Sequence, residues 1–252
     1  MIEIFILSII QGVTEFLPVS SSSHLIIISK YLNFENQSLS IDVSLHIGSF
    51  IAVITYFRKD IVNFIKNKEL FFKIFLSSIP VMLTGFLLVK FELINQLRNL
   101  QVIGWTTIIF GILLYISDKF SVENKIDNNF TIKSAIIIGV LQIFSLIPGV
   151  SRSGITITAA RILKFNRFDS AKISFFLSIP TLAAVSFFGF KNLYISNNLD
   201  FSALNLTSIF LSFVFSFITI KFFLNYIKNF NLNVFVIYRI ILGIFLLIIA
   251  YL

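Results

Sequence analysis

Long apolar runs separated by short polar connectors dominate the sequence. Six of them are long enough for a helix to cross the roughly 30 Å hydrocarbon core of a bilayer, which takes about 20 residues. These runs cover residues 41–57, 71–89, 100–117, 173–190, 207–225 and 233–251. Polar connectors such as Arg58-Lys59-Asp60 separate them. The pattern predicts an all-α, polytopic membrane protein with about six transmembrane helices.

Two further apolar stretches, 1–32 and 131–163, are interrupted at their centres. The first interruption is Pro18-Val19-Ser20-Ser21-Ser22-Ser23-His24, and the second is Pro148-Gly149-Val150-Ser151-Arg152-Ser153-Gly154. Each half of such a stretch is too short to span a bilayer, so we expect two re-entrant helix hairpins. A loop at that depth is tolerated only where it faces protein or a water-filled cavity.

The two interrupted stretches resemble each other. Gly12-x-x-Glu15 ahead of Pro18 parallels Gly139-x-x-Gln142 ahead of Pro148, and a polar linker leads from each stretch into a full span. Paired interruptions in matching positions of two halves point to an inverted repeat with its site between them. The expected organisation is one integral membrane domain of two repeats: residues 1–252, with repeats at about 1–118 and about 131–252.

The distribution of Lys and Arg predicts the orientation. If the connector 58–73 is cytoplasmic and each hairpin returns to its own side, 14 of the 20 Lys and Arg lie on cytoplasmic connectors and 4 lie outside. Cytoplasmic loops carry such an excess in membrane proteins. The first hairpin then enters from outside and the second from the cytoplasm. Both termini lie outside, and the two interruptions can meet near the midplane.

The composition supports this assignment and excludes several classes. Apolar residues make up 57% of the chain and charged residues 13%, whereas soluble domains carry about 25% charged residues. The chain has no Cys and two His, which excludes thiolate catalysis, disulfides and a His-rich metal cage. The net charge of +8 is explained by cytoplasmic loops, so we expect no nucleic-acid partner.

Ionisable residues inside apolar segments are costly and are therefore candidate site residues. Three of them stand in or beside the interruptions and are treated below: Glu15, His24 and Arg152. The others have simpler explanations. Glu3 and Asp42 are expected at the water boundary, and Arg239 is expected to snorkel to it from the last helix. His46 fits a hydrogen-bonded packing role somewhat better than a catalytic one.

The second interruption suits a phosphate group. Gly149 lets backbone N–H groups approach an anion, and a helix starting near Ser153 would present its positive end. The Arg152 guanidinium matches phosphate oxygens in a bidentate geometry. Three neighbouring hydroxyls could add hydrogen bonds: Ser151, Ser153 and Thr156. The alternative is a structural hairpin whose arginine pairs with Glu15.

The first interruption offers complementary groups. Gln11 and Glu15 lie four residues apart, on one helix face. A carboxylate tolerates a nearby phosphate when a divalent cation bridges them, and Mg²⁺ accepts one or two carboxylates together with phosphates and waters. His24 could move a proton near neutral pH, and a serine hydroxyl could attack phosphorus. Serine-rich breaks also occur in transporters, so spacing alone leaves an enzyme and a transporter nearly even.

At these positions the chain resembles a known family. Gly12-Val13-Thr14-Glu15-Phe16-Leu17-Pro18-Val19-Ser20-Ser21 with His24, and Pro148-Gly149-Val150-Ser151-Arg152-Ser153-Gly154 with Thr156, are similar to the two signatures of bacterial undecaprenyl-diphosphate phosphatases of the bacitracin-resistance type. The resemblance covers essentially the whole chain. It implies hydrolysis of undecaprenyl diphosphate to the monophosphate, which recycles a lipid carrier of cell-wall synthesis. It further implies a divalent cation such as Mg²⁺ or Ca²⁺, a site open to the outer side of the cytoplasmic membrane, and often a homodimer.

The resemblance also assigns roles to individual residues. It implies a catalytic group of Glu15, Ser21, His24 and Arg152. The residues around the phosphates would be Gln11, Ser20, Gly149, Ser151, Ser153 and Thr156. Glu15 could contact the cation through the substrate phosphates, and Ser21 is the leading nucleophile, with direct attack by water as its rival. Gln11 stands where many members have a second glutamate, and His46 stands where glutamine is expected. A lipid-phosphate flippase or anion transporter on the same inverted repeat is the alternative function.

Overall fold

The computed structural model describes residues 1–32, 38–66, 68–91, 96–195 and 203–252. Every named element in these residues is helical, which confirms the all-α prediction. Six helices are long and apolar enough to cross a membrane: α3 (Leu39–Tyr56), α5 (Lys68–Lys90), α6 (Leu100–Asp118), α10 (Arg167–Ile195), α11 (Ala203–Asn229) and α12 (Asn233–Tyr251). They coincide with the six predicted runs to within a few residues. The chain is a multi-pass membrane protein.

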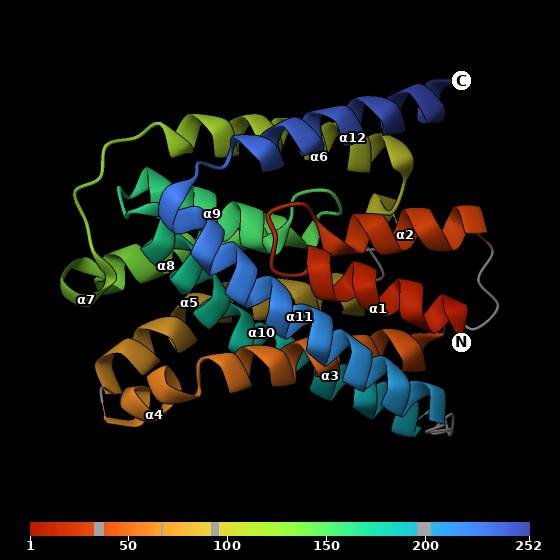
Figure 1. Ribbon diagram of the computed structural model, residues 1–252, viewed down its shortest axis with the longest axis horizontal. Coiled ribbons are helices and arrows are strands. Elements are labelled where there is room, and N and C mark those ends of the chain that lie inside the picture. The colour runs from red at the N-terminus through yellow and green to blue at the C-terminus, as the bar shows by residue number, and fades with distance from the viewer. Residues whose placement is uncertain (33–37, 67, 92–95, 196–202) are drawn as a thin grey trace.

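Both interrupted stretches form pairs of short helices. α1 (Ile2–Thr14) precedes α2 (Ser21–Leu32), and α8 (Ile132–Gln142) precedes α9 (Arg152–Ile162). None exceeds 13 residues, which at 1.5 Å per residue is too short to cross the hydrocarbon core. The loop between α1 and α2 and the loop between α8 and α9 both lie in the middle of the molecule in Figure 1. This arrangement fits two re-entrant hairpins.

Small residues bring the spanning helices close together. A Cβ atom on Gly48 of α3 would lie 2.4 Å from the carbonyl oxygen of Ile209 in α11, so only glycine permits this approach. The Ser49 hydroxyl lies 3.0 Å from that of Ser216 and 3.2 Å from that of Ser212. Close backbone packing and hydroxyl contacts of this kind hold helices together in lipid. α6 and α12 form a second adjacent pair (Figure 1).

Aromatic packing fixes the first interruption to the spanning helices. Phe16 is fully buried, and its ring packs edge-on against Phe175 of α10 with ring centroids 5.3 Å apart. Phe175 also contacts Phe223 of α11. Such edge-to-face pairs stabilise a core beyond simple area burial. The residue after Glu15 is therefore held in a rigid core.

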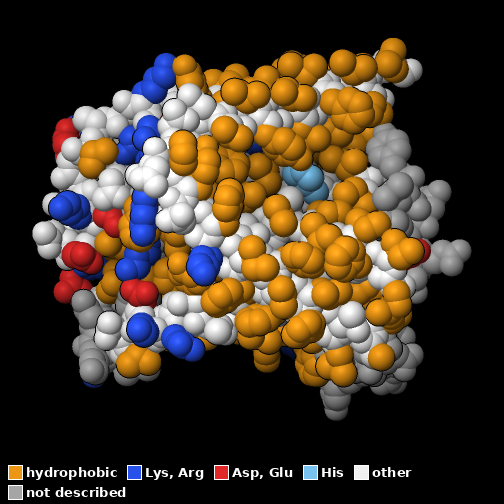
Figure 2. Space-filling view, in the orientation of Figure 1, with side chains coloured by type: hydrophobic (Ala, Val, Ile, Leu, Met, Phe, Trp, Pro, Cys, Tyr) orange, Lys and Arg blue, Asp and Glu red, His pale blue; other side chains and the backbone are white. Residues whose placement is uncertain are grey.

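Lys and Arg side chains gather at the end of the molecule opposite the two termini (Figures 1 and 2). This distribution fits the orientation predicted from the sequence. The same end contains two short helices, α4 (Arg58–Lys66) and α7 (Ile126–Asn129). Arg58-Lys59-Asp60 separate α3 from α5 as predicted, and they open an amphipathic helix in which Ile61 packs against the core.

Candidate active site

The first interruption combines a helix end with a strained serine. α1 ends at Thr14, and Pro18 in the following loop has no N–H to continue a helix. Ser20 has a φ of 76° directly before α2 begins. Its hydroxyl lies 2.9 Å from that of Ser23. A positive φ is unfavourable for a residue other than glycine, and such positions cluster at functional sites.

The second interruption repeats this geometry. Gly149 has a φ of 96°, and Ser151 has a φ of 69° directly before α9 begins. The Ser151 hydroxyl caps α9 by accepting a hydrogen bond from the Gly154 N–H at 3.1 Å. Ser20 and Ser151 thus occupy equivalent places in the two hairpins, with the same unusual backbone. The repeat seen in the sequence extends to local conformation.

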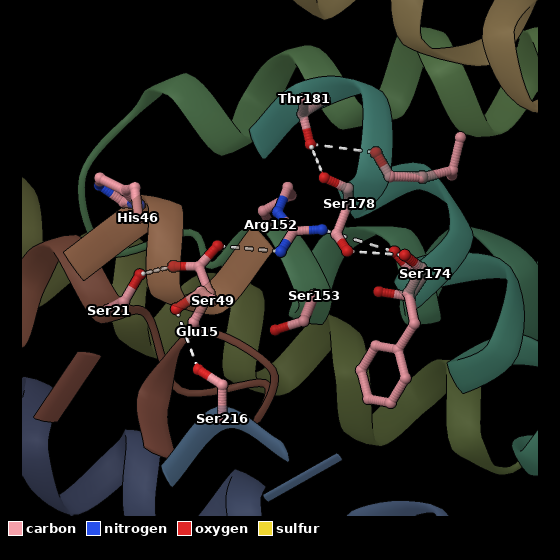
Figure 3. A network of polar contacts seen from close by, with 12 residues as sticks. Glu15, Ser21, His46, Ser49, Arg152, Ser153, Ser174, Ser178, Thr181 and Ser216 are labelled. Carbon is pink, nitrogen blue, oxygen red and sulfur yellow. Dashed lines mark hydrogen bonds and ion pairs between the residues drawn. The ribbon is translucent and has the colours of Figure 1, made fainter. Parts of the chain in front are cut away.

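Glu15 is the residue on which the two interruptions converge. Its Oε1 accepts a hydrogen bond from the Arg152 guanidinium at 2.9 Å, and its Oε2 accepts one from the Ser21 hydroxyl at 2.7 Å. Figure 3 shows the carboxylate between these two side chains. The Glu15 and Arg152 side chains are only 7% and 14% exposed, so the ion pair is largely shielded from solvent. The structure therefore brings together three of the four residues assigned to the catalytic group.

Gln11 extends this cluster to α3. Its Nε2 donates a hydrogen bond to Oε2 of Glu15 at 3.1 Å and lies 3.0 Å from Nδ1 of His46. His46 is therefore hydrogen-bonded, as a packing role requires, but it is bonded to the site itself. This contact could not be seen in the sequence, because 35 residues separate His46 from Gln11 and the packing of α3 brings the two together.

Hydroxyl groups connect α9 to its surroundings. The Ser153 hydroxyl donates to the carbonyl of Leu17 at 2.7 Å, which links the two interruptions directly. The Thr156 hydroxyl donates to that of Ser174 on α10 at 2.7 Å. The carbonyl of Ser174 also accepts a hydrogen bond from Arg152 at 3.4 Å. Ser153 and Thr156 thus link α9 to the first interruption and to α10.

Comparison with known proteins places this site in a family. The family described as "Bacitracin resistance protein BacA" matches residues 4–245. The chain belongs to this family. An undecaprenyl-diphosphatase of Pelagibacter ubique is 52% identical over 251 residues, which are 99% of this chain and 98% of that relative. An undecaprenyl-diphosphatase of Aliivibrio salmonicida is 41% identical, with 96% of this chain and 95% of the relative covered. One of Jannaschia sp. is 36% identical, with 98% of each chain covered.

Arg239 of this BacA-family protein corrects the sequence analysis. It was expected to snorkel to the membrane boundary, but its exposed fraction is 0%. Its guanidinium donates to the carbonyls of Pro18 at 3.2 Å, Val150 at 3.0 Å and Gly149 at 2.9 Å. Arg239 therefore joins both interruptions to α12. Glu3 and Asp42, expected at the water boundary, are half-buried in the first turns of α1 and α3.

Gly149 is held by α6 as well as by Arg239. A Cβ atom at Gly149 would lie 2.0 Å from the Thr106 hydroxyl and 2.7 Å from the carbonyl oxygen of Ile103. The Thr106 hydroxyl also donates to the carbonyl of Pro148 at 2.6 Å. The need for glycine at this position thus follows from its contact with α6, which the sequence did not reveal. Its predicted contact with phosphate stays a prediction.

His24 has other hydrogen-bond partners than the cluster around Glu15. Its Nδ1 is 2.6 Å from the carbonyl oxygen of Ser20, and its Nε2 is 2.5 Å from the Tyr238 hydroxyl of α12. The two rings are stacked, with centroids 5.7 Å apart. Figure 2 shows histidine atoms at the surface between the positions of α2 and α12 in Figure 1. His24 thus borders the site from the α12 side.

The site offers few ligands of its own to a cation. Among the described residues, no group of three or more His, Asp or Glu side chains could hold a metal ion. Glu15 supplies one carboxylate. Oε1 of Gln11 is buried and has no hydrogen-bond partner among the described residues, so it could supply a second oxygen. This donor set fits Mg²⁺, which accepts one or two protein oxygens and completes its shell with phosphates and waters.

Proposed function

We propose that this protein hydrolyses undecaprenyl diphosphate to undecaprenyl phosphate and inorganic phosphate in the bacterial cytoplasmic membrane. The observation that carries the proposal is the convergence of Ser21 and Arg152 on Glu15, at the junction of two broken helices. Family membership and the named relatives support it. The reaction returns the lipid carrier to cell-wall synthesis, and an abundant enzyme would confer resistance to bacitracin.

The lipid tail of the substrate stays in the bilayer during the reaction. Transfer of an alkyl chain out of lipid costs about 0.8 kcal/mol per CH₂, which a polyprenyl chain multiplies many times over. The diphosphate must therefore enter the protein from the membrane. Large apolar side chains cover much of the face shown in Figure 2, which suits an enzyme embedded in the bilayer that holds its substrate.

Substrate binding would free the catalytic carboxylate. The terminal phosphate would accept hydrogen bonds from the guanidinium of Arg152, which otherwise pairs with Glu15. Positive groups placed where charge develops are the main contribution to phosphoryl transfer. Released from this ion pair, Oε1 of Glu15 can face a cation, while Oε2 stays next to the Ser21 hydroxyl that already donates to it.

The chemical steps follow from this arrangement. The Ser21 hydroxyl transfers its proton to Glu15 while its oxygen forms a bond to the terminal phosphorus. The bond from that phosphorus to the bridging oxygen breaks, and its electron pair leaves with undecaprenyl phosphate. Water then attacks the phosphoserine, and Glu15 returns its proton to the Ser21 oxygen as the bond from that oxygen to phosphorus breaks. Inorganic phosphate leaves, and the Ser21 hydroxyl and the Glu15 carboxylate are restored. In the rival mechanism Glu15 activates water directly, and Ser21 only positions it.

A divalent cation such as Mg²⁺ or Ca²⁺ completes the proposal. Glu15 and Oε1 of Gln11 would hold it beside the substrate phosphates. When bound, the cation neutralises phosphate charge that Arg152 alone cannot balance. The opening of the site to the outer side of the membrane and the formation of a homodimer stay predictions.

Phosphate release in detergent tests the proposed function. Purified protein is mixed with undecaprenyl diphosphate, with and without a chelator, and inorganic phosphate is measured. We expect release that is suppressed by the chelator and restored by Mg²⁺ or Ca²⁺. Detergent micelles have no two sides, so a flippase or transporter gives no signal. Absence of release from well-folded protein with added cation would refute hydrolysis.

A further inference from the structure

A hollow of about 790 Å³ lies among residues at one end of the molecule. This is the Lys- and Arg-rich end, on the left in Figure 2. Its walls come from the end of α6, the segment that joins α9 to α10, and the turn between α11 and α12. None of its lining residues belongs to either interrupted loop. The hollow is therefore separate from the candidate active site.

The lining of this hollow carries an excess of positive charge. Four cationic side chains line it, against one carboxylate, that of Asp118. Arg167 binds both oxygens of Asp118, at 2.6 and 3.0 Å. Arg161 approaches the same carboxylate to 3.6 Å and otherwise donates to backbone carbonyls. The single negative charge is thus already shared by two arginines.

The other two cations are lysines held by aromatic rings. Nζ of Lys119 lies 4.1 Å from the ring centroid of Tyr115, and Nζ of Lys228 lies 5.2 Å from that of Phe168. Within the described part of the chain, neither lysine forms an ion pair with a carboxylate. Contact with a ring leaves an ammonium group free to bind an anion as well. Lys119 and Lys228 are therefore the groups in this hollow that can donate hydrogen bonds to an anion.

The position of the hollow indicates where the anion comes from. α6 and α11 end there and α12 begins there, so the hollow lies at the level of the lipid head groups on the cytoplasmic side. A second hollow of about 610 Å³ shares Phe168 and Lys228 with the first and adds Lys221. Basic pockets between membrane helices at this depth bind phosphate-bearing lipid head groups.

We propose that this hollow binds the phosphate head group of an anionic membrane lipid, with Lys119 and Lys228 as its ligands. Aromatic and aliphatic neighbours, among them Phe120 and Ile227, face the glycerol and upper acyl chains. A soluble phosphate would leave these apolar walls uncovered, whereas a lipid covers them. The bound lipid joins the ends of α6, α10 and α11. This inference goes beyond the proposed reaction and does not depend on it.

Native mass spectrometry of the detergent-purified protein tests this site. The probe is phosphatidylglycerol, with phosphatidylcholine of the same acyl chains as the neutral comparison. The variant K119Q/K228Q removes both charges and keeps similar side-chain lengths. The matched control is K125Q/K133Q, two exposed lysines of the same end that lie outside the hollow.

We expect the wild-type protein to retain phosphatidylglycerol in preference to phosphatidylcholine. Each lysine near a head group contributes about fivefold in affinity, so K119Q/K228Q should bind phosphatidylglycerol about thirtyfold more weakly. K125Q/K133Q should change the affinity less than about twofold. The single variants K119Q and K228Q should each lie between, which keeps the test valid if the double variant does not fold.

Three results would overturn the proposal. Equal retention of both lipids would remove the head-group preference. Equal losses in the two double variants would mean that diffuse surface charge, not the hollow, attracts the lipid. Displacement of phosphatidylglycerol by low millimolar inorganic phosphate would reassign the hollow to a soluble anion.

Discussion

The two interrupted loops share a backbone design but are held in different ways. In the first loop, side chains bind one another: Ser21 and Gln11 both donate to Glu15. In the second loop, the carbonyls of Pro148 and Gly149 accept hydrogen bonds from Thr106 on α6 and Arg239 on α12, and Arg239 also reaches the Pro18 carbonyl of the first loop. The second loop is thus a fixed frame that presents Arg152, whereas the first carries the groups that can exchange protons. The two loops, alike in backbone conformation, thus present different groups to the site.

Ser21→Ala should produce the largest loss of activity, because it removes the proposed nucleophile at the start of α2. We expect phosphate release to fall by about four orders of magnitude or more. Ser22→Ala is the matched control, since Ser22 is the exposed neighbour in the same serine run, and it should keep near-normal activity. An active Ser21→Ala enzyme would instead assign the attack to water.

Arg239→Met should loosen the frame that holds the second loop. It leaves the carbonyls of Pro18, Gly149 and Val150 without this donor, and an unsatisfied buried acceptor costs about 1–3 kcal/mol. We expect the free energy of unfolding to fall by about 3–5 kcal/mol, measured by denaturation in detergent. The unfolding free energy of Arg239→Lys should lie between those of the wild-type protein and Arg239→Met. An unchanged unfolding free energy in Arg239→Met would show that the clamp does not hold the loops.

Gly149→Ala tests the same frame from the side of α6. The added Cβ would meet the Thr106 hydroxyl and the backbone of α6, and alanine disfavours the positive φ. We expect a loss of about 2–3 kcal/mol in unfolding free energy. Gly85→Ala is the control, because a Cβ there would have its nearest neighbour at 3.4 Å, an ordinary contact. Equal stability of the two variants would contradict the tight packing.

Tyr238→Phe should have the smallest effect on activity, because it removes one hydrogen bond, the one to His24 in the first turn of α2. One hydrogen bond contributes about 0.5–1.5 kcal/mol, so we expect phosphate release to fall by at most about tenfold. If the His24 imidazole moves a proton, His24→Ala should reduce phosphate release more than Tyr238→Phe does. A loss in Tyr238→Phe as large as that in Ser21→Ala would place Tyr238 inside the chemistry.

The sequence was sufficient for the spanning helices and the two interruptions. Apolar runs of membrane length and the residues Pro18, Pro148 and Gly149 encode these features locally. The interruptions also identified Glu15 and Arg152, since each is a costly charge in an apolar stretch.

Features that depend on distant contacts could not be predicted. Arg239 is the seventh residue of its helix, a position that suggests snorkelling to the boundary. The carbonyls that bind it instead belong to loops about 90 and 220 residues away. His46 meets Gln11 only through the packing of α3. His24 meets Tyr238, a partner from the last helix that lies 214 residues away in the sequence. In each case tertiary packing decides the role of a residue whose local sequence is uninformative.

The Glu15–Arg152 pair provides the most direct test of the central claim, that the two loops form one site for phosphoryl transfer. Phosphate release and thermal stability are measured for Glu15→Gln, Arg152→Gln and the double variant. We predict that each single variant loses about two to three orders of magnitude in activity. In the double variant, stability should recover because no unpaired charge is left, while activity stays lost. Near-normal turnover in Arg152→Gln, or recovery of activity in the double variant, would show that the pair is only structural.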